Sequence, residues 1–115
     1  NIEIIQKNEL IARASELGKE TILALQQAAE RLEIIGEVRG RGLMIGIELV
    51  ASRETKEPLS GDRMEKVVGG LLSRGVIMVP CGRNGNVLRL MPSLTITREY
   101  MQKAVDILVS VLEDC

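Results

Sequence analysis

The chain has 115 residues, of which 45% are hydrophobic, and it balances 15 Lys and Arg against 16 Asp and Glu. This length and composition predict a single soluble globular domain with one modest core. The net charge of −1 and the single aromatic residue, Tyr100, argue against a nucleic-acid partner, which needs a basic surface and stacking platforms. No apolar run reaches membrane-spanning length, so we expect no membrane partner.

The chain contains few residues of the kinds that carry catalysis. It has no His, so it lacks both the usual neutral-pH acid–base group and the commonest metal ligand. Cys81 and Cys115 are far apart and form no Cys-x-x-Cys pair, which leaves a zinc or thioredoxin-like site without support. We therefore expect no metal site and a reducing, cytoplasmic setting.

The first 32 residues predict one long helix, over about 3–32. Its small and apolar residues recur at alternating steps of three and four, typical of a buried helical stripe. Gly18 in this stripe is expected to let another backbone approach closely. The chain begins at Asn1 directly in helix-forming sequence, so we expect a piece of a longer protein in which this helix bridges two bodies. The predicted stripe is Ile11, Ala14, Gly18, Ile22, Leu25, Ala29 and Leu32.

Two strands follow, predicted at 33–39 and 42–50, with the reversal around the sequence Arg39-Gly40-Arg41-Gly42. In the second strand the odd positions 43–49 are all aliphatic, which indicates a sheet with one face covered. The Arg-Gly repeat has two interpretations, a basic nest for a phosphate or a hairpin with solvated arginines, and the second is favoured. Residues 51–61 are predicted to form a loop because they are charged and contain Pro58.

The second half is predicted to begin with another helix, followed by two short strands. Asp62 and Glu65 have the spacing of a capping box, and Gly75 is expected to end the helix that they begin. A short strand is predicted at 76–79, a tight turn at Asn84-Gly85 and a returning strand at 87–91. The apolar face of this helix is predicted to comprise Met64, Val67, Val68, Leu71 and Leu72.

Thr97 is expected to cap the last helix, which has a regular apolar stripe. The order α-β-β-α-β-β-α predicts an α+β fold, in which helices pack on one face of a small, largely antiparallel sheet. We treat residues 1–115 as one domain, with 1–32 as a connector helix and 33–115 as the sheet and its helices. The stripe comprises Met101, Ala104, Val105, Leu108, Val111 and Leu112.

Arg89 is the main candidate for function, since it is a permanent cation in an otherwise apolar strand. Strand alternation places it on one face with Val87 and Met91, while Leu88 and Leu90 point to the other face. The residues alone leave three interpretations of Arg89. It pairs with Glu48 of the neighbouring hairpin, it extends to solvent at the sheet edge, or its guanidinium binds the carboxylate of a ligand through paired hydrogen bonds.

The remaining candidate groups do not form an active site. The lysines at 7, 19, 56, 66 and 103 lie among polar residues, without the apolar surroundings that would prepare one for a Schiff base. The serines at 60, 73, 93 and 110 have no nearby base in the sequence. Cys81 is more simply a packing residue at a strand end than an activated thiol.

Three segments together resemble the C-terminal small domain of class III aminotransferases, which depend on pyridoxal phosphate. They are VRGRGLMIGIEL (38–49), RGVIMVPCGRNGNVLRLMPSLTIT (74–97) and the amphipathic helix that runs to Leu112. The segment CGRNGNVLR most resembles the 4-aminobutyrate and 2,4-diaminobutyrate aminotransferases. This resemblance covers nearly the whole chain, although Met91-Pro92-Ser93-Leu94 departs slightly from the family pattern.

The resemblance implies a pyridoxal-phosphate transaminase that moves an amino group from a small ω-amino acid to 2-oxoglutarate. It implies that Arg89 binds the α-carboxylate of glutamate or 2-oxoglutarate. The catalytic lysine and the cofactor contacts would belong to a large domain of the same enzyme, so this chain alone would be inactive, with no catalytic, cofactor-binding or metal-binding residue. The full-length enzyme is expected to be a homodimer or larger assembly. The alternative is a stand-alone binding or oligomerisation module that uses Met44, Gly46 and Val50.

Overall fold

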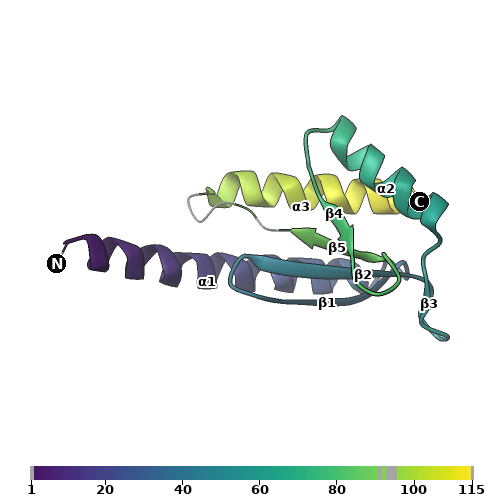
Figure 1. Cartoon of the computed structure of the whole chain (residues 1–115), viewed down its shortest axis with the longest axis horizontal. Coiled ribbons are helices and arrows are strands. Elements are labelled where there is room, and N and C mark those ends of the chain that lie inside the picture. Colours follow the sequence, from purple (N-terminus) through teal and green to yellow (C-terminus); the bar gives the residue numbers. More distant parts are fainter. Residues whose placement is uncertain (1, 91, 93–95, 115) are drawn as a thin grey trace.

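The computed structural model describes residues 2–90, 92 and 96–114, with side chains from residue 9 onward. Three helices lie against an antiparallel sheet, and the long first helix extends beyond the sheet at its N-terminal end (Figure 1). The predicted α-β-β-α-β-β-α order and the α+β class are confirmed, with one additional short strand, β3. The elements are α1 (Ile2–Ala29), β1 (Ile35–Arg41), β2 (Met44–Ser52), β3 (Glu57–Pro58), α2 (Gly61–Ser73), β4 (Val79–Cys81), β5 (Val87–Leu90) and α3 (Arg98–Glu113).

The strands are ordered β1-β2-β5-β4, and β3 pairs with the end of β2. All these pairings are antiparallel. The pairs Arg39–Gly46, Gly46–Arg89 and Val79–Arg89 put four residues in one row across the sheet. Because β5 lies between β2 and β4, two segments more than forty residues apart in sequence meet in this row.

The core lies between the helices and one face of the sheet. Ile47 and Leu88 are opposite each other in the two central strands, and both are 0% exposed. The helices contribute Leu25, Leu71 and Leu108, each at most 1% exposed. The alternation predicted for residues 43–49 is therefore confirmed. Burial of these aliphatic side chains is the main stabilising contribution to the fold.

Gly18 places α1 against the β1–β2 turn. A Cβ at this position would lie 1.8 Å from the carbonyl oxygen of Gly42, so only glycine permits this contact. The buried stripe differs from the predicted one, since Ile11 is 52% exposed while Leu17, Thr21 and Ala28 are buried. The Thr21 hydroxyl donates to the Leu17 carbonyl at 2.8 Å, which satisfies it within the helix.

Helix α1 ends at Ala29 rather than near residue 32. The Arg53 guanidinium, which follows β2, donates to the carbonyl oxygens of Ala29, Leu32 and Ile35, the last two at 2.9 and 3.2 Å. The last carbonyl groups of a helix have no hydrogen-bond donor inside the helix. A cation at this end can donate to them, and it is also attracted by the negative end of the helix dipole. Nothing local in the sequence indicated this role for Arg53.

The caps of the other helices agree in part with prediction. Thr97 accepts a hydrogen bond from the Tyr100 amide at 3.2 Å, as predicted, and Gly75 follows α2 with a φ of +86°. The capping box predicted from Asp62 and Glu65 is wrong, because Ser60 is the N-cap and accepts from the Arg63 amide.

The apolar stripes of α2 and α3 are mostly confirmed. Leu72 is the exception on α2, at 59% exposed, while Val68 and Ala104 are half-buried.

Three strand boundaries also differ. The first hairpin turns two residues later than predicted, because Gly42 adopts the positive φ of +58° and Gly40 stays extended in β1. Strand β4 is at 79–81 instead of 76–79, since Met78 points into the core and pairing with β5 begins at Val79. The predicted loop at 51–61 contains the end of β2 and all of β3. Met91, the predicted end of the last strand, lies outside the described residues.

Exposed ion pairs join α3 to α1 and to the turn that follows α1. Arg98 donates to Glu20 through Nε and Nη2 at 2.8 and 3.0 Å, and Arg31 donates to Glu113 at 2.6 Å. The hydrogen bond from Arg98 to Glu20, and then their charge attraction, raise the pKa of Arg98 above its ordinary value. A raised pKa on a basic group adds stability that is lost when pH rises through that pKa, so the Arg98 guanidinium itself loses its contribution only in strongly alkaline solution. No helix among the described residues is long and apolar enough to span a bilayer.

Candidate functional site

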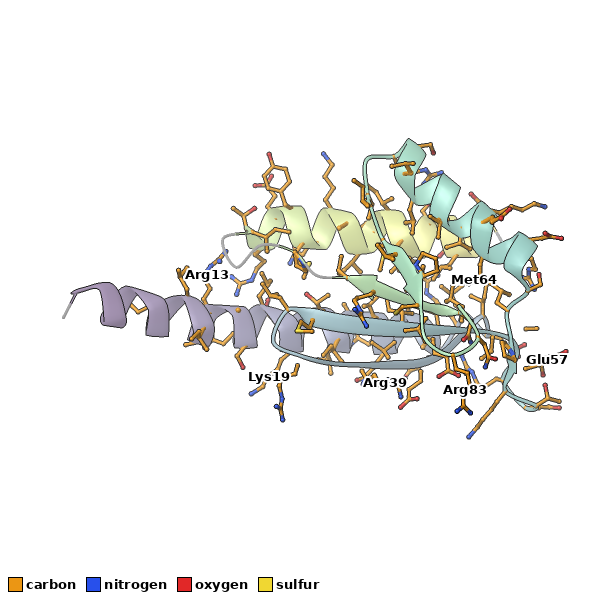
Figure 2. All side chains as sticks on the ribbon, viewed as in Figure 1. Arg13, Lys19, Arg39, Glu57, Met64 and Arg83 are labelled. Carbon is orange, nitrogen blue, oxygen red and sulfur yellow. The ribbon has the colours of Figure 1, made fainter. Side chains whose placement is uncertain are left out.

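The candidate site lies on the sheet face that the helices leave open. The row Arg39, Gly46, Arg89 and Val79 crosses the sheet on this face, and the charged side chains of Arg39 and Arg89 are both exposed. Figure 2 shows the Arg39 side chain projecting from β1 on the side away from α3. Alternation within each strand turns these side chains outward, since Val38 before Arg39 and Leu88 and Leu90 around Arg89 are buried in the core.

Arg89 has no anionic partner among the residues whose side chains are described. It forms no ion pair with Glu48, although Glu48 pairs with Val87, which lies two residues before Arg89 on the same open face. Leu88 and Leu90 are buried behind it at 0% and 9% exposed, as alternation predicted. The ion pair with Glu48 is therefore wrong as an explanation for Arg89, and the guanidinium is available to an external group.

A shallow pocket of about 280 Å³ lies beside Arg89. Arg89 and Arg39 lie on opposite sides of it, and Gly40, Gly46 and Cys81 are among the other residues that line it. Gly46 has no side chain, which leaves space between the two arginines. The pocket is thus a small, open cleft with a cation on each side.

The other candidates from the sequence do not join this pocket as functional groups. Of the two interpretations of the Arg-Gly repeat, the favoured one, a hairpin with solvated arginines, is confirmed, because 39–41 form an exposed extended strand whose successive N–H groups point to opposite sides and make no phosphate nest. Cys81 is a half-buried free thiol at the end of β4.

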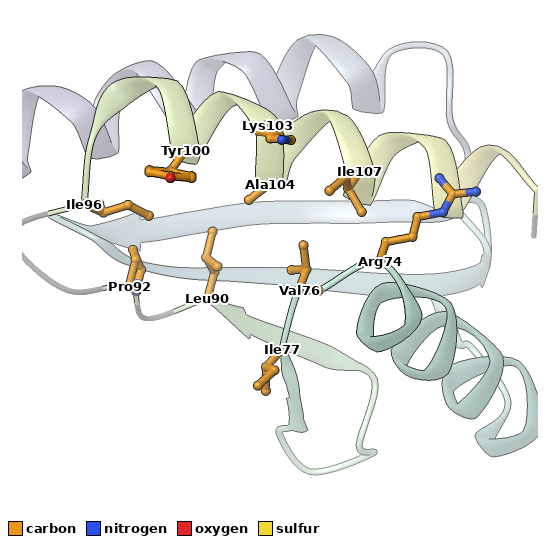
Figure 3. Close-up of a pocket in the computed structure, with 11 residues that line it drawn as sticks. Arg74, Val76, Ile77, Leu90, Pro92, Ile96, Tyr100, Lys103, Ala104 and Ile107 are labelled. Atoms are coloured by element: carbon orange, nitrogen blue, oxygen red, sulfur yellow. The ribbon is translucent and has the colours of Figure 1, made fainter.

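A larger cavity, of about 490 Å³, lies on the other side of the molecule between α3 and residues 74–77 (Figure 3). Most of its lining is aliphatic, with Ile77, Leu90 and Ile107 among the residues shown. Arg74 at one end already donates to the Ser110 hydroxyl at 2.8 Å. Its lining includes the exposed side chains of Tyr100 and Lys103 but no carboxylate or thiol, so no pair of catalytic groups meets in it.

The described residues do not fit a pyridoxal phosphate site. The lysines at 19, 56, 66 and 103 are all exposed, and they lie on helices or in the loop after β2, away from the open sheet face. No cluster of metal-ligating side chains occurs in the described part of the chain either. The described side chains therefore offer no evident holder for the cofactor expected from the sequence, and those on the open face are groups that can bind and orient an anion.

Comparison with known proteins identifies the family. Residues 1–112 match the class III aminotransferase family model, so the chain belongs to that family. The chain is 42% identical over 113 residues to the leucine/methionine racemase of Thermococcus litoralis, and 42% identical over 116 residues to the 4-aminobutyrate aminotransferase of Mycobacterium leprae. Each alignment covers 98% of this chain but 25% of the relative, so the chain spans about a quarter of these relatives.

Solved structures agree with this assignment. An aminotransferase from Bacillus anthracis matches with a TM-score of 0.86 and 34% identity, over 100% of this chain and 26% of that one. A phospholyase from Arthrobacter in complex with phosphoethanolamine matches with a TM-score of 0.89 and 29% identity, over 98% and 26% of the two chains. The fold predicted from the resemblance is thereby confirmed.

The sequence did not indicate that Arg39 lies close to Arg89. Arg39 was grouped with Arg41 and Gly42 as part of a turn, and its pairing across β2 follows only from the strand order. One available signal was Gly46, the single glycine in β2, because a glycine inside a strand often marks a place where another group approaches the sheet closely.

Proposed function

We propose that this chain is the C-terminal small domain of a pyridoxal-phosphate transaminase. In this proposal the complete enzyme moves an amino group from a small ω-amino acid, of the 4-aminobutyrate or 2,4-diaminobutyrate type, to 2-oxoglutarate. A large domain of the same enzyme would hold the cofactor, and this chain would be inactive alone. Family membership and 42% identity to a 4-aminobutyrate aminotransferase support this assignment.

The observation that carries the proposal is the unpaired Arg89 on the open face. A guanidinium binds a carboxylate through two parallel hydrogen bonds, which fixes the orientation of the acid as well as attracting it. Strand β5 is central in the sheet, and its covered side is packed against the core, so the Arg89 backbone is held firmly. Arg89 would therefore orient the α-carboxylate of glutamate or 2-oxoglutarate toward the reacting centre.

The test is Arg89→Ala in the full-length enzyme. The variant loses the two charge-assisted hydrogen bonds from the guanidinium to the carboxylate. The apparent second-order rate constant for 2-oxoglutarate, measured in single-turnover experiments, should therefore fall by about 10- to 100-fold. Arg83→Ala is the matched control, because Arg83 is an exposed arginine in the β4–β5 turn and does not line the pocket. An unchanged rate with 2-oxoglutarate would overturn the role of Arg89.

Racemisation is a second candidate reaction. Two relatives are amino-acid racemases, the second being the alanine/serine racemase of Pyrococcus horikoshii at 36% identity. A racemase also needs to hold an α-carboxylate, but it requires no amino acceptor. Incubation of the full-length enzyme with L-leucine alone, followed by chiral chromatography, separates the two: D-leucine indicates racemisation. Glutamate formed from 4-aminobutyrate and 2-oxoglutarate indicates transamination.

The alternative of a stand-alone oligomerisation module loses part of its surface. Val50 is 2% exposed and packs beside β3, which leaves Met44 as the large exposed side chain of the proposed patch. Sedimentation of the isolated chain tests this alternative, since a defined oligomer without ligand would favour it.

We further propose that the complete enzyme is cytoplasmic and at least a homodimer, and that residues 1–32 connect this chain to the large domain. The free thiol of Cys81 supports a reducing compartment, and the projecting first helix supports the connection.

A further inference from the structure

We infer that Asn86 is a positioning residue for Arg89, because its side chain fixes the register in which β5 lies against β2. This inference rests on the proposed function, since the position of Arg89 affects activity only if Arg89 binds substrate. It names the residue that keeps Arg89 opposite Gly46. Asn86 itself is buried, at 5% exposed, and does not line the pocket beside Arg89.

Asn86 binds both backbone groups of one residue in β2. Its carbonyl oxygen accepts from the Leu49 amide at 2.8 Å, and its side-chain Nδ2 donates to the Leu49 carbonyl oxygen at 2.7 Å. In a regular antiparallel pair, the backbone amide of the opposite residue makes the second of these hydrogen bonds. The side chain of Asn86 makes it here, so the last step of the pairing between β2 and β5 depends on an amide side chain at this position.

The apolar residues of the two strands do not fix this register by themselves. The covered face of β2 has aliphatic side chains at 45, 47 and 49, and that of β5 has leucines at 88 and 90. A slip of one residue would expose the leucines of β5, so burial forbids it. A slip of two residues keeps all of them on the covered face, because the alternation has a period of two. Burial therefore permits registers that differ by two residues.

The connection between the strands does not fix the register either. In a hairpin the turn sets the pairing, but the chain between β2 and β5 contains β3, α2 and β4. The glycine turn before Asn86, with φ of +86° at Gly82 and +64° at Gly85, joins β5 to β4. Strand β4 lies at the edge of the sheet and pairs with β5, so it would slip together with β5.

A slip of two residues would take Arg89 away from Gly46. In one direction Arg89 would lie opposite Glu48, whose carboxylate would neutralise the guanidinium, and in the other it would lie opposite Met44. In both directions Asn86 would lose Leu49 as its partner. The two hydrogen bonds of Asn86 therefore favour the one register in which Arg89 is available to a substrate.

Thr21 provides the comparison, because it is the other buried polar side chain in the described part of the chain. Its hydroxyl donates to the carbonyl of Leu17, four residues earlier in the same helix. Asn86 instead donates to a residue 37 positions away, in another strand. Loss of either hydrogen bond should destabilise the protein, but only the loss at Asn86 should change the strand register.

The experiment measures the register by disulfide trapping in the full-length enzyme. Residues 48 and 87 are opposite each other and adjacent to the hydrogen-bonded pair of Leu49 and Asn86, so their Cα atoms should lie about 4.5 Å apart, close enough for a disulfide. Glu48→Cys with Val87→Cys therefore reports the native register. Glu48→Cys with Arg89→Cys reports the slipped one. Both pairs include Cys81→Ser, because Cys81 also lies opposite Val87, and peptide mass spectrometry identifies the bonds.

Asn86→Leu keeps a side chain of similar size and removes the donor. We expect it to raise the yield of the 48–89 disulfide by about 5- to 10-fold. Asn86→Ala removes the same donor without adding apolar volume and should give the same pattern. Thr21→Val, the matched control, should leave both disulfide yields unchanged.

Kinetics then connect the register to Arg89. Without the added cysteines, Asn86→Leu should lower the single-turnover second-order rate constant for 2-oxoglutarate by the factor by which the 48–87 yield falls, about 2- to 5-fold, because only the native register binds. Thr21→Val should leave this rate constant unchanged, whatever it does to the melting temperature.

The outcomes separate this inference from the proposed function. An unchanged 48–89 yield in both Asn86 variants, or an equal rise in Thr21→Val, would overturn the inference, and the proposed function stands if Arg89→Ala still lowers the rate with 2-oxoglutarate. If the Asn86 variants shift the disulfide yields but neither they nor Arg89→Ala alter that rate, the proposed function is wrong, and the role of Asn86 in positioning Arg89 is lost with it.

Discussion

Alternate residues of the same strands lie on the two faces of the sheet, and the two faces differ in the substitutions that they tolerate. On the covered face, Ile47 meets Leu88 with no exposure to solvent, whereas one residue away Gly46 meets Arg89 in the open. On the covered face, side-chain volume and close contact determine which residues fit, because packed interiors respond to changes of a single methylene group. On the open face, charge and free space determine which groups can bind there. Fold and function can therefore be changed separately within a single strand.

The largest expected effect is at the contact between α1 and the first hairpin. Gly18→Val would place a Cβ on the Gly42 carbonyl, at 1.8 Å, so α1 or the hairpin must move. We expect the free energy of unfolding to fall by about 3 kcal/mol or more. Thermal denaturation followed by circular dichroism measures this. Gly69→Ala is the control: it lies in α2 with no atom within 4 Å of the added Cβ, and it should stabilise by about 0.5–1 kcal/mol.

The next effect contrasts two adjacent residues of β5. Leu88→Ala removes a side chain that is 0% exposed at the centre of the core and should cost about 2–5 kcal/mol of unfolding free energy. Arg89→Ala should change stability by less than about 0.5 kcal/mol, because its side chain is exposed and unpaired within the described residues. Equal losses in the two variants, measured by denaturant titration, would contradict the division between the faces.

A smaller effect is expected at the end of α1. Arg53→Gln removes the guanidinium that donates to three carbonyls and should lower the free energy of unfolding by about 1 kcal/mol. Amide hydrogen exchange should also accelerate in the last turn of α1. Arg83→Gln serves for comparison, and a loss as large in that variant would show that the effect is one of net charge.

The smallest effect is predicted at Gly46. An added Cβ would lie 3.4 Å from Val87 Cγ1, an ordinary contact, so Gly46→Ala should alter stability by less than about 0.5 kcal/mol. The same change narrows the cleft between Arg39 and Arg89. A stable protein with weaker 2-oxoglutarate binding is the expected result, and a melting temperature as low as that of Gly18→Val would show that position 46 belongs to the core after all.

Local patterns in the sequence determined the fold class and much of the core. The Thr97 cap, the Gly75 stop, the close approach at Gly18 and the aliphatic alternation in 43–49 were all predicted and are present. Each of these features depends on residues within a few positions of one another, or on a single glycine, whose lack of a side chain indicates a close contact or a positive φ. The outward orientation of Arg89 belongs to this group, since it follows from its buried neighbours.

Only the tertiary structure decided the features that join distant segments. The strand order brought Arg39 beside Arg89, the pairing with β5 placed β4 three residues later than predicted, and Arg53 reached back to the end of α1. Ser60 replaced the predicted cap because the chain enters α2 directly after β3. These outcomes depend on which strand pairs with which and in what register. Periodicity along one segment fixes which way a side chain faces, but it carries no information about the residue that will lie opposite.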